Sequence, residues 1–262
     1  MLAAARSTPM PPEREAPDVE TASDGYARRF EGEVGAWFLE VQQDLVLDLL
    51  TPWPRGRVLE VGGGHAQLAG PLIRSGYEVT VHGSDPVCRE RLDRLVPAGS
   101  FRFVTSDLPH LPFPDRSFDV VLAVRLLTHM SRWREMVAEM CRVASHAVIV
   151  DYPDLRSFNL LYGPLFAWKK AMEGNTRTFL TFRPGEVPAE LARHGFGRRT
   201  FRRQFFVPMV VHRVVCRGLG TAGVSRGVEK VSGALGLTRA LGSPVILRAA
   251  REQAQHDSSE VR

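Results

Sequence analysis

Three consecutive glycines follow a short apolar run in residues 57–69, which read R-V-L-E-V-G-G-G-H-A-Q-L-A. A glycine inside a strand or helix costs about 0.5–1 kcal/mol relative to alanine, so three in a row indicate a turn. A turn that only packs against its neighbours needs one glycine, whereas three leave backbone open to a close approach. The segment therefore predicts a strand that ends in a ligand-binding turn.

Short apolar runs alternate with helical patterns on both sides of this turn. We expect strands over residues 57–61, 78–81, 101–104, 118–124 and 147–152. We expect helices near residues 34–50, 66–75, 86–95 and 133–143. Nearly continuous apolar strands between helices are typical of a parallel sheet that is buried on both faces. The sequence therefore predicts a doubly wound α/β fold, with its ligand beyond the carboxyl ends of the strands.

The length of 262 residues fits one large domain. Residues 1–24 are rich in Pro, Ala, Glu and Ser, so we expect a disordered tail there, a domain over 25–252 and a second disordered tail over 253–262. No apolar run reaches the roughly 18–20 residues of a membrane span, and the first residues are too short a stretch for a signal peptide. We therefore expect a cytoplasmic location.

Positive charge gathers in the last third of the chain. The net charge is +5, and between residues 193 and 248 the only acid is Glu229. The basic residues of that range are Arg193, Arg198, Arg199, Arg202, Arg203, Arg213, Arg217, Arg226, Lys230, Arg239 and Arg248. Such a bias suits an acidic substrate, an anionic membrane surface or nucleic acid, or it only solvates the protein surface. Few aromatic residues are interleaved with these arginines, so we do not expect a nucleic-acid partner.

The three cysteines, Cys88, Cys141 and Cys216, are far apart and include no C-x-x-C pair. This spacing suits neither a disulfide framework nor a zinc site. We expect buried free thiols and no metal site.

The glycine turn distinguishes between two classes of ligand. Gly62 and Gly64 match the dinucleotide fingerprint G-x-G-x-x-G, but Gln67 stands at the third glycine position. Glu60, two residues before the first glycine, puts a carboxylate next to the turn. A carboxylate repels a pyrophosphate and attracts a positively charged amino group. The turn therefore favours a ligand with an ammonium group, and a nicotinamide-dependent oxidoreductase stays an alternative.

Four segments resemble, in order, the motifs of one enzyme family. E-V-G-G-G-H-A resembles acid-x-G-x-G-x-G with Ala66 at the last glycine, and G-Y-E-V-T-V-H-G-S-D-P resembles the second strand with its terminal acid. S-D-L-P-H-L-P-F-P-D-R-S-F-D-V-V and L-A-V-R-L-L-T-H-M resemble the segments around the fourth strand. Residues 57–152 are thereby similar to class I S-adenosylmethionine-dependent methyltransferases, in the broad group that includes the ubiquinone/menaquinone C-methyltransferases.

The resemblance implies a Rossmann-like, seven-stranded, mostly parallel sheet, in which an antiparallel last strand lies beside the fifth. Residues 201–206 and 243–249 can supply the two final strands. Residues 153–241 would then carry substrate-side helices, with 207–241 as an insertion.

The resemblance also implies S-adenosylmethionine as the cofactor. Its site would include Glu60, Gly62, Gly63, Gly64, Asp85, Asp107, Leu108, Val124 and Arg125. Asp85, about two residues later than the family's acid, would hold the ribose hydroxyls. Asp107 would bind the adenine amino group, and the amide of Leu108 would bind its ring nitrogen. Val124 and Arg125 belong to the stretch that would line the pocket between cofactor and substrate.

Methyl transfer from a sulfonium is an in-line displacement, in which positioning can supply about 7–11 kcal/mol. A general base is needed only where the acceptor holds its proton at neutral pH. His129 is the candidate base, because its ordinary pKa lies near neutrality and the resemblance places it by the substrate pocket. The alternative is a histidine that caps a helix or packs below the pocket. Asp151 and Tyr152 are further candidates for orienting an acceptor.

Aromatic residues gather in two further segments. Those of residues 26–38 would belong to a lid over the cofactor by the resemblance, or to a helix packed at the sheet edge. Those of residues 156–183 suggest a small apolar or aromatic acceptor, such as a quinone, a polyketide or another natural-product intermediate, although a helix packed on the sheet would carry the same residues. We therefore expect a small-molecule methyltransferase, with a non-catalytic nucleoside-binding protein as the second alternative. Peripheral membrane contact and the oligomeric state stay open.

Overall fold

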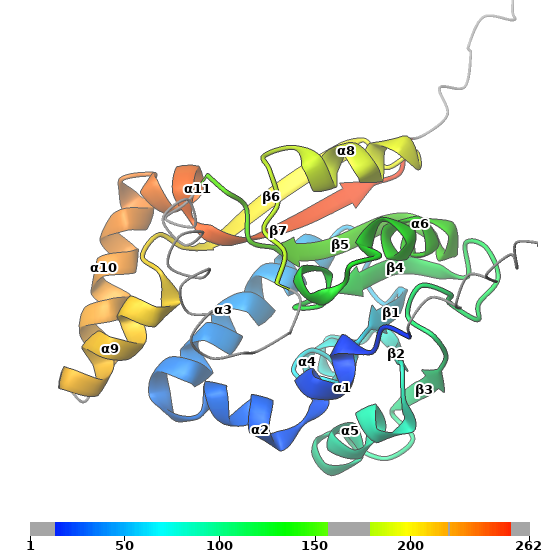
Figure 1. Cartoon of the computed structure of the whole chain (residues 1–262), viewed down its shortest axis with the longest axis horizontal. Helices are drawn as coiled ribbons and strands as arrows, with labels where there is room; N and C mark the ends of the chain where they lie inside the picture. Colours follow the sequence, from blue (N-terminus) through cyan, green and yellow to red (C-terminus); the bar gives the residue numbers. More distant parts are fainter. Residues whose placement is uncertain (1–13, 157–178, 220, 253–262) are drawn as a thin grey trace, which may run out of the picture.

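The computed structural model describes residues 14–156, 179–219 and 221–252, and its centre is a seven-stranded sheet (Figure 1). The strand order is β3-β2-β1-β4-β5-β7-β6. The strands are β1 (Arg57–Val61), β2 (Glu78–Gly83), β3 (Phe101–Thr105), β4 (Phe118–Ala123), β5 (Ala144–Tyr152), β6 (Arg198–Phe205) and β7 (Ser243–Ala250). The first five strands are parallel, and β7 runs antiparallel between β5 and β6. The predicted fold class is confirmed.

Helices cover both faces of the sheet. One face packs against α3 (Gly32–Leu50), α4 (Ala69–Arg74) and α5 (Glu90–Leu95), and the other packs against α6 (Trp133–Val143) and α8 (Glu186–Arg193). Val58 of β1 lies in the first core and Leu59 in the second, and both are fully buried. Because neighbouring residues of a strand point to opposite faces, a strand covered on both sides is apolar throughout, which explains the continuous runs in the sequence.

Two helical additions flank the sheet. Beyond β6 lie α9 (Met209–Leu219), α10 (Gly223–Ala234) and α11 (Leu237–Leu241), in the range where an insertion is predicted. Before α3 lie α1 (Pro17–Ala22) and α2 (Asp24–Ala27). No helix in the described ranges is long and apolar enough to cross a membrane. The aromatic-rich segment that suggested an apolar acceptor falls mostly on residues 157–178, and the predicted C-terminal tail on 253–262, outside the described residues.

The prediction of a disordered tail over residues 1–24 is wrong for residues 14–24. Helix α1 is folded, and Asp18, Thr21 and Ala22 are buried. The tail was predicted because it lacks large apolar residues, but its contacts with the sheet are mainly polar, as described below. Polar contacts with loops distant in sequence leave no hydrophobic periodicity by which they could be predicted.

Candidate functional site

The glycine turn after β1 is compact. Gly62 and Ala66 both have left-handed backbones, with φ values of 71° and 61°, and the short helix η2 (Gly63–His65) joins them. A Cβ on Gly63 would lie 2.6 Å from the carboxyl carbon of Glu60, and one on Gly64 would lie 2.8 Å from the Cβ of Ala22. Both distances are far inside van der Waals contact. The glycines are therefore required by the Glu60 side chain and by the close approach of helix α1.

Two opposite charges lie near the carboxyl ends of β1 and β4. Burial raises the pKa of Glu60 to about 8, an effect that the nearby Arg125 guanidinium partly offsets. Burial also lowers the pKa of Arg125, against the charge of Glu60. Within the described part of the chain the two groups form no ion pair, and Oε2 of Glu60 and Nη1 of Arg125 have no hydrogen-bond partner. Since buried polar atoms are nearly always paired, these two point to a ligand that carries both charges.

The Arg125 guanidinium is held in place by its neighbours. It donates a hydrogen bond to Oε1 of Gln67, and it lies over the rings of Phe30 and Tyr26, 4.9 Å and 5.8 Å from their centroids. Its backbone has a positive φ of 59°, a strained conformation for a side chain of this size. Tyr26 and Phe30 thus lie against Arg125, whereas Trp37 and Phe38 pack with Phe205 in a separate core.

Asp151 at the end of β5 fixes the backbone of this arginine. One carboxylate oxygen accepts a hydrogen bond from the Arg125 N–H, and the other accepts one from Nε2 of Gln42 at 2.9 Å. Burial raises the pKa of Asp151 to about 6. These contacts show that Asp151 supports Arg125. The sequence suggested Asp151 only as a candidate for orienting an acceptor.

The N-terminal segment 14–22 lies across the carboxyl ends of four strands. The Asp18 carboxylate accepts a 2.7 Å hydrogen bond from the Ser84 N–H after β2, and a second from the Ser84 hydroxyl. Arg14 forms a 3.0 Å ion pair with Asp107 after β3. Thr21 O lies 3.2 Å from Nδ1 of His65 after β1, and Glu15 accepts a 2.9 Å hydrogen bond from the Ser131 N–H after β4. The segment therefore covers the glycine turn and the place predicted for adenosine.

The predicted adenosine residues have protein partners in this structure. Asp85 caps the short helix η3 (Pro86–Arg89) by accepting a 3.0 Å hydrogen bond from the Val87 N–H. The Asp107 side chain is 61% exposed and is paired with Arg14. Leu108 is fully buried. The carboxylate beside the end of β2 is that of Asp18, which sequence reasoning missed because the segment lacks a recognisable motif.

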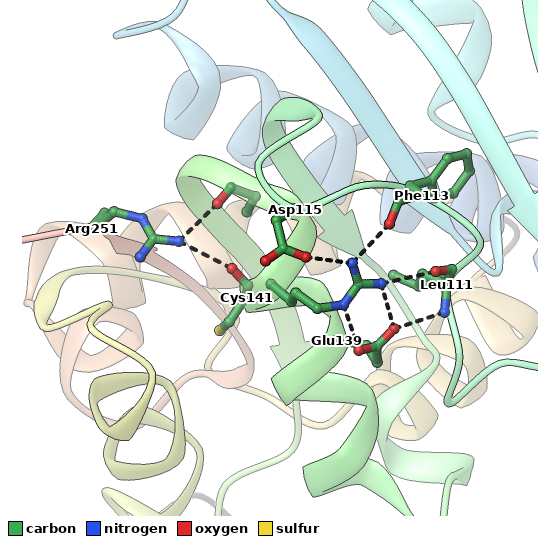
Figure 2. A network of polar contacts seen from close by, with 8 residues as sticks. Leu111, Phe113, Asp115, Glu139, Cys141 and Arg251 are labelled. Atoms are coloured by element: carbon green, nitrogen blue, oxygen red, sulfur yellow. Dashed lines mark hydrogen bonds and ion pairs between the residues drawn. The ribbon is translucent and has the colours of Figure 1, made fainter.

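An arginine clamp holds the loop that follows Asp107 and Leu108 (Figure 2). Arg142 of α6 donates to the carbonyls of Leu111 and Phe113 at 2.9 Å and 2.8 Å, and to carboxylate oxygens of Asp115 and Glu139. Glu139 in turn accepts a 3.0 Å hydrogen bond from the Leu111 N–H. The loop is thus anchored to α6, and the anchor restrains the segment that directly follows Asp107.

The remaining candidates lie around the same strand ends. His129 is in η4 (Leu127–His129), and its ring packs against Phe179 at a centroid distance of 5.8 Å. Burial lowers the pKa of His65 to about 3, so this histidine is neutral. It is part of the glycine turn after β1. Val124, next to Arg125, is partly buried against the core under α3 and α4. Among the described residues no cluster of His, Cys, Asp and Glu could hold a metal ion.

Comparison with known proteins shows what the central segment is similar to. Residues 59–149 match a family described as "Methyltransferase domain". The chain is 32% identical over 150 residues to the phthiotriol/phenolphthiotriol dimycocerosates methyltransferase of Mycobacterium tuberculosis (strain ATCC 25618 / H37Rv), a match covering 55% of this chain and 52% of that protein. It is 34% identical over 94 residues to the ubiquinone/menaquinone biosynthesis C-methyltransferase UbiE of Azotobacter vinelandii, covering 33% and 37%.

The fold has a counterpart among solved structures. The crystal structure of magnesium protoporphyrin IX methyltransferase (ChlM) from Synechocystis PCC 6803 with bound SAH superimposes with a TM-score of 0.59, at 16% identity, over 88% of this chain and 96% of that one. At this identity the likeness concerns the fold. The matched segment spans about half the length of the Mycobacterium relative and less of UbiE.

Proposed function

We propose, from the match of residues 59–149 to a methyltransferase domain family, that this chain transfers a methyl group from S-adenosylmethionine to a small molecule. The observation that carries the proposal is the pair of unpartnered buried atoms, Oε2 of Glu60 and Nη1 of Arg125. The amino-acid tail of S-adenosylmethionine carries an ammonium and a carboxylate. The Glu60 carboxylate would hold the first and the Arg125 guanidinium the second.

This chain's own residues would bind and orient, while the bound cofactor supplies an electrophilic methyl group. Asp151 and Gln67 fix Arg125 at its backbone and its guanidinium, so the carboxylate-binding group is set before the ligand arrives. Tyr26 and Phe30 cover Arg125 and would keep water away from its contact with the ligand carboxylate. Exclusion of water strengthens an ionic contact. Alignment of the reacting atoms is the main contribution that such a site makes.

Cofactor binding would compete with docking of segment 14–22. The Cβ of Ala22 lies against Gly64, Asp18 is bonded at the end of β2, and Arg14 is paired with Asp107. These are the places that the family motifs assign to the cofactor. The segment would have to shift from the glycine turn before the adenosine part could enter.

The acceptor would be apolar or aromatic, by analogy with relatives named for quinone and dimycocerosate substrates. His129 would serve as the general base for an acceptor that holds its proton. We expect His129→Ala to reduce S-adenosylhomocysteine formation on a panel of phenols, hydroquinones and carboxylic acids by about 10²–10⁴-fold, with cofactor affinity unchanged. Full turnover in this variant would remove His129 as the base.

Calorimetric titration tests the cofactor directly. S-adenosylmethionine, S-adenosylhomocysteine, NAD and NADP are titrated in parallel into the full chain. We expect binding of the two sulfur nucleosides only. Binding of a nicotinamide nucleotide instead would support the oxidoreductase alternative, and binding of the sulfur nucleosides with no turnover on any acceptor would support a non-catalytic nucleoside-binding protein.

A further inference from the structure

A second candidate binding site lies at the β6 edge of the sheet, separated from β1 by three strands. A cavity of about 850 Å³ opens between edge strand β6 and helices α10 and α11. Five arginines line it: Arg156, Arg199, Arg202, Arg203 and Arg239. We propose that this cavity binds a multiply charged anion of the phosphate type, such as a phosphate monoester or a pyrophosphate.

The residue pattern of β6 indicates that one face of this strand does not pack into a hydrophobic core. Arg199, Phe201 and Arg203 alternate along β6, so their side chains lie on one face. They pair with Ala249, Leu247 and Val245 of β7, all buried in the core under α6 and α8. The same face is thus apolar on β7 and basic on β6. Arginines at positions where an apolar residue would extend the core indicate a surface that faces a polar ligand or solvent.

Nearby acids neutralise only part of the charge. Asp154 pairs with Arg203 at 3.1 Å and with Arg156 at 3.3 Å, and Asp48 pairs with Arg202 at 2.8 Å. Among the described residues, the side chains of Arg199 and Arg239 form neither an ion pair nor a hydrogen bond, in contrast to the other three arginines. Within the described ranges, the five arginines therefore exceed their two acidic partners, Asp154 and Asp48, by three positive charges.

One of the guanidinium groups is fixed in advance. The Arg203 side chain is only 8% exposed and Asp154 only 1%, and Nη1 of Arg203 also donates a 3.0 Å hydrogen bond to the Gly242 carbonyl. A group that is already ordered loses less conformational entropy when a ligand binds. Arg199 and Arg239 are exposed and would close on the ligand from the strand and from α11.

The charge and the donor type together select the ligand class. A single carboxylate would neutralise one of the three excess charges, whereas a phosphate monoester or pyrophosphate carries two or more. Arginine presents a planar fork of donors that matches phosphate oxygens and keeps its charge at all ordinary pH values. Thr200 and Thr238 add hydroxyl groups to the lining, and Phe201, which is 40% exposed, adds an aromatic ring.

The test uses inorganic pyrophosphate as the probe, titrated calorimetrically into the full chain at low salt. The double variant Arg199→Gln/Arg239→Gln removes two exposed guanidinium groups. Arg74→Gln/Arg102→Gln is the matched control, because it removes the same charge from exposed sites on α4 and on β3, at the opposite edge of the sheet. We expect pyrophosphate affinity to fall at least tenfold in the first variant and less than twofold in the control, with equal thermal midpoints.

Vesicle binding distinguishes a lipid phosphate from a soluble phosphate as the ligand of this site. Sedimentation with phosphatidylglycerol vesicles that is lost in Arg199→Gln/Arg239→Gln and competed by pyrophosphate would assign the site to a lipid phosphate. Pyrophosphate binding without vesicle binding would assign it to a soluble phosphate, and either result supports the proposal. Absence of pyrophosphate binding at millimolar concentration, or an equal loss in both double variants, would overturn it.

Discussion

The carboxyl edge of the sheet has two halves that differ in how their charges are satisfied. At the ends of β2 and β3, Asp18 is bonded to Ser84 and Asp107 is paired with Arg14. At the ends of β1 and β4, Glu60 and Arg125 each keep a buried polar atom without a partner in the described part of the chain. The first half is filled by the chain's own N-terminal segment. The second retains two ionisable groups, a carboxyl and a guanidinium, to which a zwitterionic ligand would be complementary.

The largest expected effect concerns the unpaired half and its pH dependence. Because the pKa of Glu60 is about 8, only about 1% of Glu60 is ionised at pH 6 and about half at pH 8. Binding of an ammonium group requires the ionised form, so affinity for S-adenosylhomocysteine should rise by about 50-fold between these pH values. The measurement is a series of calorimetric titrations.

Glu60→Gln is the control for that series. Its affinity should be low and flat between pH 6 and pH 8, and a rise equal to that of the native chain would rule out Glu60 as its source. In the absence of ligand, a rise in pH has the opposite effect, because it lowers the stability of the folded chain. The folded-state pKa of Glu60 lies above the ordinary value of 4.5, so its contribution to stability falls as pH rises from about 4.5 and is fully lost above about 8. The thermal midpoint of Glu60→Gln should therefore exceed that of the native chain at pH 9.

The next effect concerns the filled half. Asp18→Ala removes the carboxylate that holds α1 to Ser84, and a hydrogen bond to a charged group contributes about 1.5–3 kcal/mol. We expect the affinity for S-adenosylhomocysteine to rise about tenfold, since 1.4 kcal/mol corresponds to that factor. Glu20→Ala on the same helix is the control, because the Glu20 carboxylate accepts a hydrogen bond from Arg29. A fall in affinity would mean that Asp18 itself binds the cofactor.

The smallest effect concerns Arg14. Its ion pair with Asp107 is exposed, with side chains 53% and 61% accessible, and exposed ion pairs contribute about 0–1 kcal/mol. Arg14→Gln should therefore raise S-adenosylhomocysteine affinity by less than about fivefold, as a direct titration would show. A large rise would mean that Arg14 controls the segment, and a loss of affinity would mean that Arg14 contacts the ligand.

The comparison of the halves also shows which features could be predicted from the sequence and which could not. The parallel strands follow from the apolar runs, the antiparallel last strand follows from the family resemblance, and Glu60 stands out in the sequence as an acid beside a glycine turn. The role of Arg125 depends on a positive φ and on contacts with Tyr26, Gln67 and Asp151. Such contacts join residues far apart in sequence, so no local pattern reveals them.

The contacts of the filled half could not be predicted from the sequence, for a physical reason. Asp85 has the residue type expected of a ribose ligand, but an acid directly before Pro86 is also a favoured helix cap, and that is how it is bonded here. Segment 14–22 reads as a disordered tail by composition. It is ordered by a few charged side chains and by one alanine that fits against Gly64.

The most direct test of the account compares two ligands on two proteins. S-adenosylhomocysteine has the amino-acid tail, and 5′-methylthioadenosine has the same nucleoside without it. Both are titrated into the native chain and into Arg125→Gln. If Arg125 holds the tail, the variant should bind S-adenosylhomocysteine about 10–100-fold more weakly and 5′-methylthioadenosine with unchanged affinity. An equal loss for both ligands, or no loss for either in a folded variant, would contradict the assignment of the unpaired half to a zwitterionic tail.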